Sequence, residues 1–153
     1  PLLAWTTTTP VMQPKEHPKK DIMAIMADQQ IPYAATATIA YPEDLLRKLE
    51  KAKQIRGTRF IHLFTPCPPG WKTPSELSVK ISRLAVRSRV FPLYEIENGR
   101  TYTIQEESRI VPVKDYLKLQ GRFSHLTEKD VEETQKRVDE AWEHLLRRAR
   151  CFI

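Results

Sequence analysis

The spacing of apolar side chains predicts that helices and short strands alternate along the first part of the chain. A helical period begins at Lys19 and ends before Pro32. Its apolar face consists of Ile22, Ile25 and Met26. Residues 33–39 are small and apolar, which predicts a strand that is covered on both faces. The first elements are therefore expected to be a helix followed by a buried strand.

A second helix and a second strand follow in the same order. Pro42 stands where the first turn of a helix tolerates proline, two acidic residues follow it, and Gly57 ends the segment. The apolar stripe of this helix consists of Leu45, Leu49, Ala52 and Ile55. Residues 60–64 have the composition of a buried strand. Because strands separated by helices of this length pair in parallel, and two strands are too few for a stable sheet, we expect further strands from outside this chain.

A stiff loop follows the second strand. Residues 65–71 read Thr-Pro-Cys-Pro-Pro-Gly-Trp, and the prolines and glycine argue against both helix and strand. Cys67 lies at the centre of this loop, at the end of a strand, where α/β proteins place ligand-binding groups. Two other interpretations stay open: Cys67 is a small buried hydrophobe, or it is a loop residue without a task.

The rest of the chain combines helices with one antiparallel hairpin. Ser75 is a suitable N-cap for a third helix, whose inward face consists of Leu77, Ile81, Leu84 and Ala85. Residues 91–96 and 102–104 flank an Asn-Gly pair, the strongest short signal for a hairpin. Residues 112–119 predict a short helix, and Thr127 with Asp130 predicts the capping box of a long final one. The inward stripe of that helix consists of Val131, Val138, Trp142, Leu145 and Ala149. The expected fold class is α/β, a parallel sheet flanked by helices with a C-terminal hairpin and long helix.

Composition limits the class of protein. The chain has 153 residues, 41% hydrophobic and 29% charged, which suits one globular domain. Its net charge of +6 is spread among interleaved acids and bases, so we expect no direct binding of nucleic acid. No apolar run approaches the roughly 18 residues of a membrane span, so no membrane partner is expected. Two cysteines, Cys67 and Cys151, cannot build a disulfide framework, which favours a reducing compartment and a cytoplasmic location.

No catalytic constellation is complete within these residues. The four histidines lack metal-ligand spacing, and no glycine-rich phosphate loop is present. The threonine run Thr6–Thr9 fits ordinary loop chemistry, and it also fits a site for an anionic ligand. The chain begins at Pro1 without a methionine, and we expect it to be part of a longer polypeptide.

Six ordered segments carry a resemblance to a known family. They are Ala-Trp-Thr-Thr-Thr-Thr-Pro (4–10), Lys-Lys-Asp-Ile-Met-Ala-Ile-Met-Ala (19–27), Ala-Thr-Ile-Ala-Tyr-Pro-Glu-Asp (37–44), Thr-Pro-Cys-Pro-Pro-Gly-Trp (65–71), Phe-Pro-Leu-Tyr-Glu-Ile-Glu-Asn-Gly (91–99) and Tyr-Leu-Lys-Leu-Gln-Gly-Arg-Phe (116–123). Together they resemble the C-terminal half of the beta subunit of pyruvate:ferredoxin oxidoreductase (pyruvate synthase) and its 2-oxoacid relatives.

The resemblance implies thiamine-dependent oxidative decarboxylation of a 2-oxoacid to its acyl-CoA, with electrons passed to ferredoxin. The implied cofactors are thiamine diphosphate, Mg²⁺ and a [4Fe–4S] cluster, with Cys67 as one of four cluster ligands and the remaining cofactor residues outside this chain. It implies that residues 1–90 are part of the thiamine-diphosphate-binding domain and that 91–153 are an extension for subunit contacts. The implied partners are other subunits, ferredoxin and coenzyme A, and the chain alone is expected to be inactive.

Two departures and two alternatives accompany this resemblance. Pro1-Leu2-Leu3 and Lys72-Thr73 differ from the usual family residues, and the first departure lies at the expected edge of the cofactor pocket. One alternative is a non-catalytic remnant or interaction module of the same fold. The other is a basic binding protein, which a steep salt dependence on polyanion columns would reveal. The motifs do not distinguish pyruvate from branched-chain 2-oxoacids.

Overall fold

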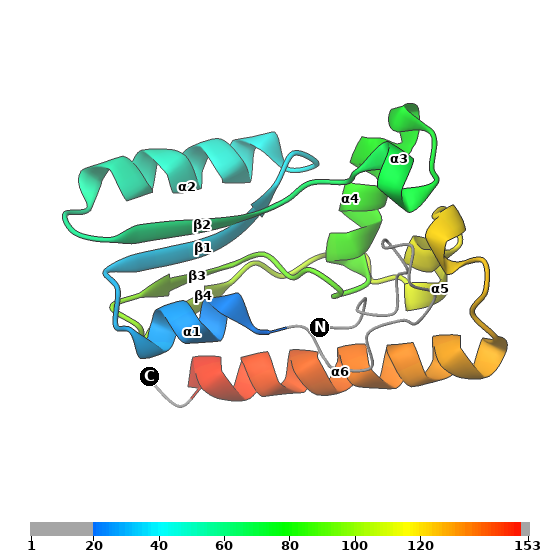
Figure 1. Ribbon diagram of the computed structural model, residues 1–153. Coiled ribbons are helices and arrows are strands. Elements are labelled where there is room, and N and C mark those ends of the chain that lie inside the picture. The colour runs from blue at the N-terminus through cyan, green and yellow to red at the C-terminus, as the bar shows by residue number, and fades with distance from the viewer. Residues whose placement is uncertain (1–19, 151–153) are drawn as a thin grey trace.

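The centre of the fold is β1 (Tyr33–Thr38), in which every residue is buried. It pairs in parallel with β2 (Arg59–Phe64) and antiparallel with β3 (Tyr94–Glu97), and β3 pairs antiparallel with β4 (Thr101–Ile104). The sheet order is therefore β2-β1-β3-β4 in this computed structural model, which describes residues 20–150 (Figure 1). The predicted α/β class and the predicted buried strand are confirmed.

The hairpin lies in the same sheet as the parallel pair. β3 and β4 supply two of the four strands and lie next to β1 on the side away from β2. On that side, the expectation that further strands come from outside this chain is therefore wrong. Asn98 and Gly99 both have positive φ, 52° and 69°, as the predicted Asn-Gly turn requires. A side chain at position 99 would lie 2.3 Å from the Ala27 carbonyl oxygen, so this turn also needs glycine for its close approach to the first helix. Residues on both sides of position 90 thus build one sheet.

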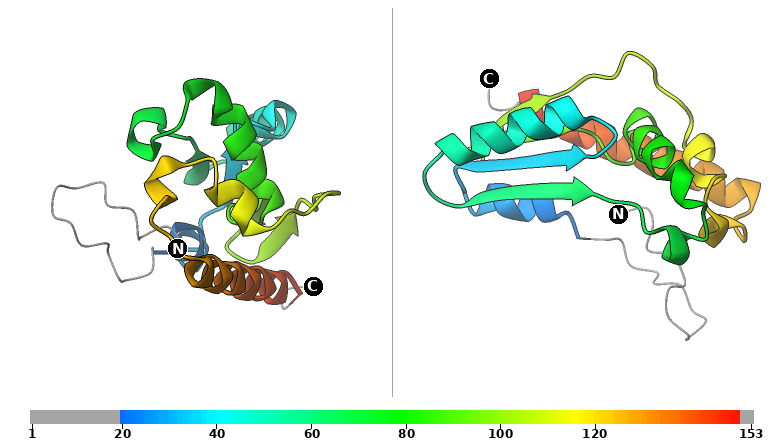
Figure 2. Two further views of the ribbon diagram at one scale, coloured as in Figure 1. Left: turned by 90° about the vertical axis from the view of Figure 1, so that its right-hand side faces the viewer. Right: turned by 90° about the horizontal axis from the view of Figure 1, so that it is seen from above.

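Helices cover both faces of this sheet (Figures 1 and 2). α2 (Pro42–Gln54) packs on one face against β1. α1 (Ile22–Asp28) and the long α6 (Glu128–Arg150) cover the opposite face, α1 against β1 and α6 against β4. The core on the α1 and α6 side consists of Met23, Ala27, Ile31, Ala34, Tyr94, Ile96 and Leu145.

A second core lies at one end of the sheet. It joins α4 (Ser78–Arg87) and α5 (Val113–Leu117) to the first half of α6. Its buried members are Ile81, Ala85, Val113, Tyr116, Leu117, Phe123 and Val138. The expected capping box is confirmed, because the Thr127 backbone N–H donates to Asp130 Oδ2 at 2.8 Å and the Asp130 N–H donates to Thr127 Oγ1 at 3.3 Å. Within residues 20–150, no helix combines the length and the apolar character that crossing a membrane requires.

Two predicted helix faces differ from the observed ones. α1 begins at Ile22, capped by Asp21, and it buries Met23 and Ala27 while Ile25 remains 40% exposed. α2 buries Ala52 together with Lys48, and Leu49 of the predicted stripe remains 40% exposed. The reason in α2 is electrostatic. The sheet beneath this helix carries a carboxylate that attracts cationic side chains to the inward face, and hydrophobic periodicity does not predict inward cations.

The region after β1 also corrects three predictions. β2 is a partly exposed edge strand rather than a buried one. Pro68–Trp71 forms one helical turn, α3, because proline at the first helical positions gives up no intrahelical hydrogen bond. The N-cap of α4 is Leu77, since Ser75–Leu77 forms the separate 3₁₀ turn η1. Residues 1–19, with the threonine run, and Cys151 lie outside the described residues.

Candidate functional site

Cys67 lies immediately before α3, where the chain leaves β2 (Figure 1). Its thiol belongs to an exposed residue, so the interpretation as a small buried hydrophobe is wrong. The Cys67 carbonyl accepts a hydrogen bond of 2.8 Å from the Trp71 N–H, which closes the turn. A side chain at position 70 would lie 3.2 Å from Cys67 Sγ, so Gly70 leaves space beside the sulfur. The thiol is therefore accessible on a backbone whose freedom the prolines restrict.

A cation lies close to this turn. Arg122 comes from the 3₁₀ turn η2 (Gly121–Phe123), and its guanidinium carbon lies 3.7 Å from the centre of the Trp71 ring. It also lies 4.6 Å from the centre of the Phe123 ring. This geometry is a cation–π arrangement, which is strongest when the cation is shielded from water. Arg122 thus joins α3 to a segment about fifty residues further along the chain.

The remaining contacts of Arg122 are neutral. Its Nε and Nη2 donate to Gln120 Oε1 at 3.0 and 2.6 Å, and Gln120 donates to the Tyr116 carbonyl at 2.7 Å. Within residues 20–150, the structure shows no ion pair between Arg122 and a carboxylate. Burial lowers the pKa of Arg122 from its ordinary value, and the Tyr116 hydroxyl and the Cys67 thiol act in the opposite direction. The guanidinium remains charged at any physiological pH.

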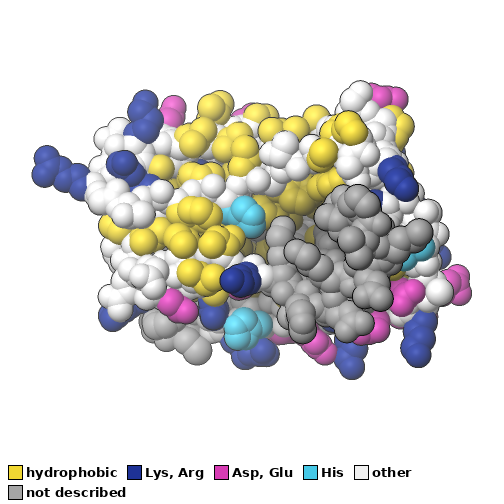
Figure 3. All heavy atoms as spheres, viewed as in Figure 1, with side chains coloured by type: hydrophobic (Ala, Val, Ile, Leu, Met, Phe, Trp, Pro, Cys, Tyr) yellow, Lys and Arg dark blue, Asp and Glu magenta, His cyan; other side chains and the backbone are white. Residues whose placement is uncertain are grey.

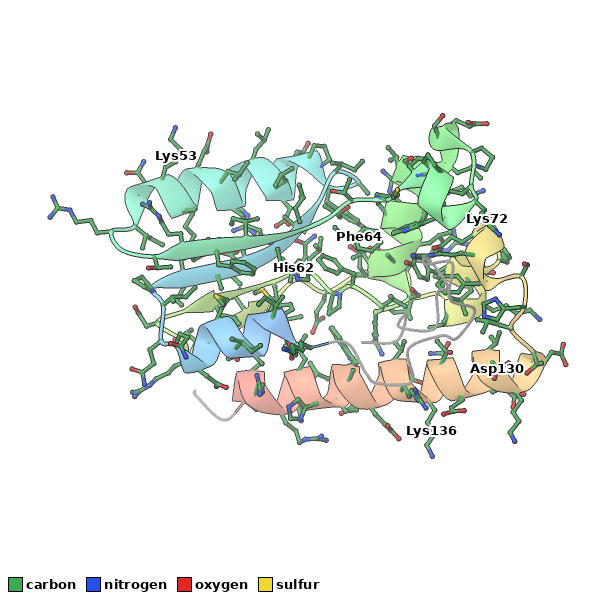
Figure 4. The ribbon with its side chains drawn as sticks, viewed as in Figure 1. Lys53, His62, Phe64, Lys72, Asp130 and Lys136 are labelled. Atoms are coloured by element: carbon green, nitrogen blue, oxygen red, sulfur yellow. The ribbon has the colours of Figure 1, made fainter. Side chains whose placement is uncertain are left out.

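Backbone contacts fix the position of α3 against η2. The Gly121 N–H donates to the Lys72 carbonyl at 3.1 Å, and Thr73 Oγ1 donates to the Leu119 carbonyl at 2.8 Å. A side chain at position 121 would lie 2.9 Å from that same Lys72 oxygen, so this contact requires glycine. Lys72, which has a φ of 51° and ends α3, lies where the two segments meet (Figure 4). The departures at Lys72 and Thr73 therefore lie in the connection between α3 and η2.

Aromatic side chains extend from β2 to this corner. Phe64 packs against Trp71 with ring centres 5.7 Å apart and against Phe91 at 5.0 Å. The ring of His62 meets that of Phe91 edge-on, with centres 5.2 Å apart. In the described part of the chain, no three His, Cys, Asp or Glu residues are grouped so that they could hold a metal ion. The corner offers the accessible thiol of Cys67, the guanidinium of Arg122 and an aromatic support.

A second polar cluster lies between α2 and the sheet. Glu95 accepts hydrogen bonds from Tyr33 at 2.8 Å, Arg47 at 2.7 Å and Lys51 at 2.9 Å. Burial raises the pKa of Glu95, but the bonds from Lys51, Arg47 and Tyr33 outweigh it and lower the pKa to about 2. Lys48 is fully buried beside this group and donates to Asp44 at 2.6 Å and to the Thr36 carbonyl at 2.9 Å. Because each charge finds a partner inside the cluster, its role is structural.

Sequence reasoning missed the Glu95 cluster and the contact of Arg122 with Trp71, although the Glu95 cluster had a usable signal. An acidic residue within an apolar strand, Glu95, requires a buried partner, and the earlier helix α2 carries cations at positions 47, 48 and 51. Arg122 had no such signal, because its ring contacts with Trp71 join segments that composition and periodicity do not connect.

Comparison with known proteins identifies relatives over almost the whole chain. No protein-family model matches it. It is 49% identical over 159 positions, 99% of this chain, to ketoisovalerate oxidoreductase subunit VorB of Pyrococcus horikoshii, of which it covers 50%. It is 48% identical over 143 positions, 92% of this chain, to pyruvate synthase subunit PorB of Methanocaldococcus jannaschii, of which it covers 48%. PorB of Pyrococcus horikoshii is 40% identical over 168 positions, 95% of this chain and 51% of PorB.

The chain therefore spans about half the length of the curated relatives that it matches. The relatives are subunits of two oxidoreductases that are named for different 2-oxoacids, ketoisovalerate and pyruvate. Both names agree with the resemblance that the six segments carry. Over almost its whole length the chain is accordingly similar to one half of ketoisovalerate oxidoreductase subunit VorB and of pyruvate synthase subunit PorB.

Proposed function

We propose that this chain forms part of the beta subunit of a 2-oxoacid:ferredoxin oxidoreductase, in which Cys67 supplies one thiolate ligand to a [4Fe–4S] cluster. The observation that carries the proposal is the similarity to VorB and PorB over nearly the whole chain, within which Cys67 is exposed on a proline-restricted turn. The proposed reaction is oxidative decarboxylation of a 2-oxoacid to its acyl-CoA, with thiamine diphosphate and Mg²⁺ as cofactors and ferredoxin as electron acceptor. The names of the relatives support a short-chain 2-oxoacid and leave pyruvate and ketoisovalerate as the two candidates.

The residues at the α3 corner fit a cluster site to which this chain contributes one ligand. An iron–sulfur cluster takes about four thiolates, and Cys67 is the one cysteine among residues 20–150. The accessible thiol and the space beside Gly70 suit a ligand that the chain contributes to a site shared with other segments. When bound, the cluster would supply one-electron transfer. The other ligands, and the residues for Mg²⁺ and diphosphate, would come from the polypeptide that completes the relatives' length.

The chain's own residues have two roles in this proposal. The turn holds the thiol in place, so that little backbone freedom is lost when it binds iron. Arg122 brings a positive charge, without a carboxylate partner among the described residues, to the side of an otherwise anionic thiolate site. Burial around a cluster and charge beside it both change its reduction potential.

Substitution of Cys67 in the assembled enzyme tests the proposal. Cys67→Ala removes one of about four iron ligands, so we expect loss or conversion of the cluster, seen as lower iron content and a changed electron paramagnetic resonance spectrum. Ferredoxin reduction should fall much further than release of carbon dioxide from the 2-oxoacid, because decarboxylation depends on the organic cofactor.

Cys151→Ala is the matched control, since it removes the other thiol of the chain. It should leave iron content and ferredoxin reduction unchanged. If the two variants keep the same iron content and reduce ferredoxin equally well, Cys67 is a loop residue without a task and the assignment is wrong. Equal melting temperatures of the variants exclude a general folding defect as the cause of lost iron.

A further inference from the structure

A cavity lies between the end of α4, the second half of α6 and the 105–112 segment, which joins β4 to α5. Figure 2 shows this segment passing along one side of the molecule from β4 to α5. The volume of the cavity is about 260 Å³. Pockets for drug-sized ligands measure roughly 300–1,000 Å³, so this cavity suits a smaller molecule.

Most of the wall of this cavity is apolar. Figure 3 looks onto α1, α2 and β2, where hydrophobic side chains gather, and none of these elements lines the cavity. The cavity is therefore separate from that apolar face. Its own apolar lining consists of Val86, Pro92, Leu93, Ile110, Trp142 and Leu146.

Arg89, which also lines the cavity, has a backbone conformation that favours glycine. Its φ is 61°, and it directly follows Ser88, the C-cap of α4. The N–H groups of Ser88 and Arg89 donate to the Leu84 and Val86 carbonyls at 2.8 and 2.9 Å, which completes the cap. Glycine adopts this conformation without a steric penalty and is the usual residue at the position. The cap alone thus gives no reason for an arginine, so the reason lies in the side chain.

The side chain of Arg89 has a cation–π contact but no anionic partner. Its guanidinium carbon lies 4.6 Å from the centre of the Trp142 ring. Its Nε is buried and donates to no acceptor among residues 20–150, and no carboxylate of that range pairs with the guanidinium. A buried donor without an acceptor is costly, and a carboxylate can accept from a guanidinium through both of its oxygens. Arg89 is therefore suited to bind a carboxylate that enters the cavity.

The other charged groups of the cavity define the charge of such a ligand. Arg150 lines the cavity and has no carboxylate partner among the described residues. Of the two acidic residues that line it, Glu107 lies 3.6 Å from Arg87 Nε, which leaves Glu106. Two cations against one unpaired acid leave one positive charge, and a single negative charge balances it.

We propose that this cavity binds a short-chain monocarboxylate, whose carboxylate pairs with Arg89 and Arg150 and whose carbon chain lies against the apolar wall. Short 2-oxoacids and the corresponding saturated acids belong to this class. The inference uses neither Cys67 nor a cluster, so the proposed function and this binding site can fail independently.

Titration of the 153-residue chain with isovalerate tests the proposal, followed by calorimetry and by tryptophan fluorescence. We expect a dissociation constant on the order of 1 mM, as suits a small ligand. Trp142→Phe should remove the fluorescence change, which places the ligand at this cavity. Arg89→Gln should weaken binding at least about tenfold because the charged donor is lost, and Arg89→Lys should recover part of it. Arg56→Gln is the matched control, because Arg56 is exposed and lies outside the cavity lining, and it should bind like the wild type.

A further variant separates binding from stability. Arg89→Gly removes the guanidinium but suits the backbone of position 89, so it should keep the melting temperature of the wild type and lose isovalerate binding. If Arg89→Gly and Arg89→Gln both bind isovalerate as the wild type does, Arg89 holds no carboxylate and the proposal is wrong.

Three further ligands distinguish the proposed class from other classes. Acetate should bind more weakly than isovalerate, because it lacks the apolar chain. Equal binding of 3-methylbutan-1-ol would show an apolar cavity without a carboxylate site, and equal binding of acetate would show a general anion site. Tighter binding of valine would assign an ammonium partner to Glu106 and make the ligand an amino acid. Each of these three results overturns the proposal, as does a wild-type chain that binds no isovalerate.

Discussion

Two regions of the molecule withdraw charged groups from water, and they use different partners. Beneath α2, Glu95 and Lys48 are both buried, and carboxylates meet cations at distances of 2.6 to 2.9 Å. At the α3 corner, the half-buried Arg122 meets two aromatic rings and an amide oxygen. In the first region each buried charge has a partner of opposite charge, so the cluster stabilises the fold. The second keeps a net positive charge beside an accessible thiol, which is an arrangement suited to an anionic group.

The largest expected effect belongs to the cluster beneath α2. Glu95→Ala leaves Arg47, Lys51 and Tyr33 without their shared acceptor, and loss of one member of a buried ionic cluster costs about 3–5 kcal/mol. Chemical denaturation of the 153-residue chain measures this loss. Glu97→Ala is the matched control, because Glu97 contacts Lys51 from a 38% exposed position and should cost at most about 1 kcal/mol. If Glu95→Ala and Glu97→Ala lower the free energy of unfolding by similar amounts, the buried position of Glu95 does not make its ion pairs stronger than those at the surface.

The second effect is a dependence of stability on pH. Since the pKa of Glu95 falls from its ordinary value of 4.5 to about 2 in the folded state, its contribution is complete above about pH 5 and is lost as the pH falls towards 2. The difference of pKa corresponds to a contribution on the order of 3 kcal/mol. Unfolding free energies measured from pH 7 to pH 2 should therefore decline less steeply in Glu95→Gln. A parallel decline in both proteins would assign the acid sensitivity to other carboxylates.

The contrast between these two regions also explains what the sequence could and could not predict. Local signals predicted the Asn98-Gly99 turn, the Thr127 and Asp130 capping box and the buried run of β1, because each depends on neighbours in the chain. The same signals failed to predict the inward face of α2. There, cations pair with a carboxylate on β3, which lies far from α2 in the sequence.

The candidate site was predictable in part. The composition of the loop pointed to Cys67, whose thiol is exposed, and its role as a cluster ligand stays a prediction. The prolines misled the assignment of secondary structure, since at the start of a turn they favour helix as readily as they exclude it elsewhere. The contact of Arg122 with Trp71 could not be predicted, because it depends on the long-range packing of η2 on α3.

A smaller effect is expected at the α3 corner, and it concerns redox chemistry. If the positive charge of Arg122 acts on a cluster at Cys67, Arg122→Gln should lower the midpoint potential of that cluster, because a cation favours the more negative reduced form. We expect a change on the order of 60 mV, equivalent to a tenfold shift in a one-electron equilibrium. Potentiometric titration of the assembled enzyme measures it, and Arg122→Lys, which keeps the charge, should recover most of the change. Equal potentials for wild type and Arg122→Gln would show that the charge of Arg122 does not act on the cluster.

The smallest effect measures the stack itself. A double-mutant cycle with Arg122→Gln and Trp71→Leu should give a coupling energy of about 1 kcal/mol, the usual size for a partly shielded cation–π contact. Arg89 and Trp142 provide the matched pair, since their cation-to-ring distance is 4.6 Å against 3.7 Å for Arg122 and Trp71. Because the attraction weakens with distance, the coupling of Arg89 to Trp142 should be the smaller of the two. A coupling at Arg89 as large as that at Arg122 would mean that the corner beside Cys67 holds its cation no more firmly than the Arg89–Trp142 contact does.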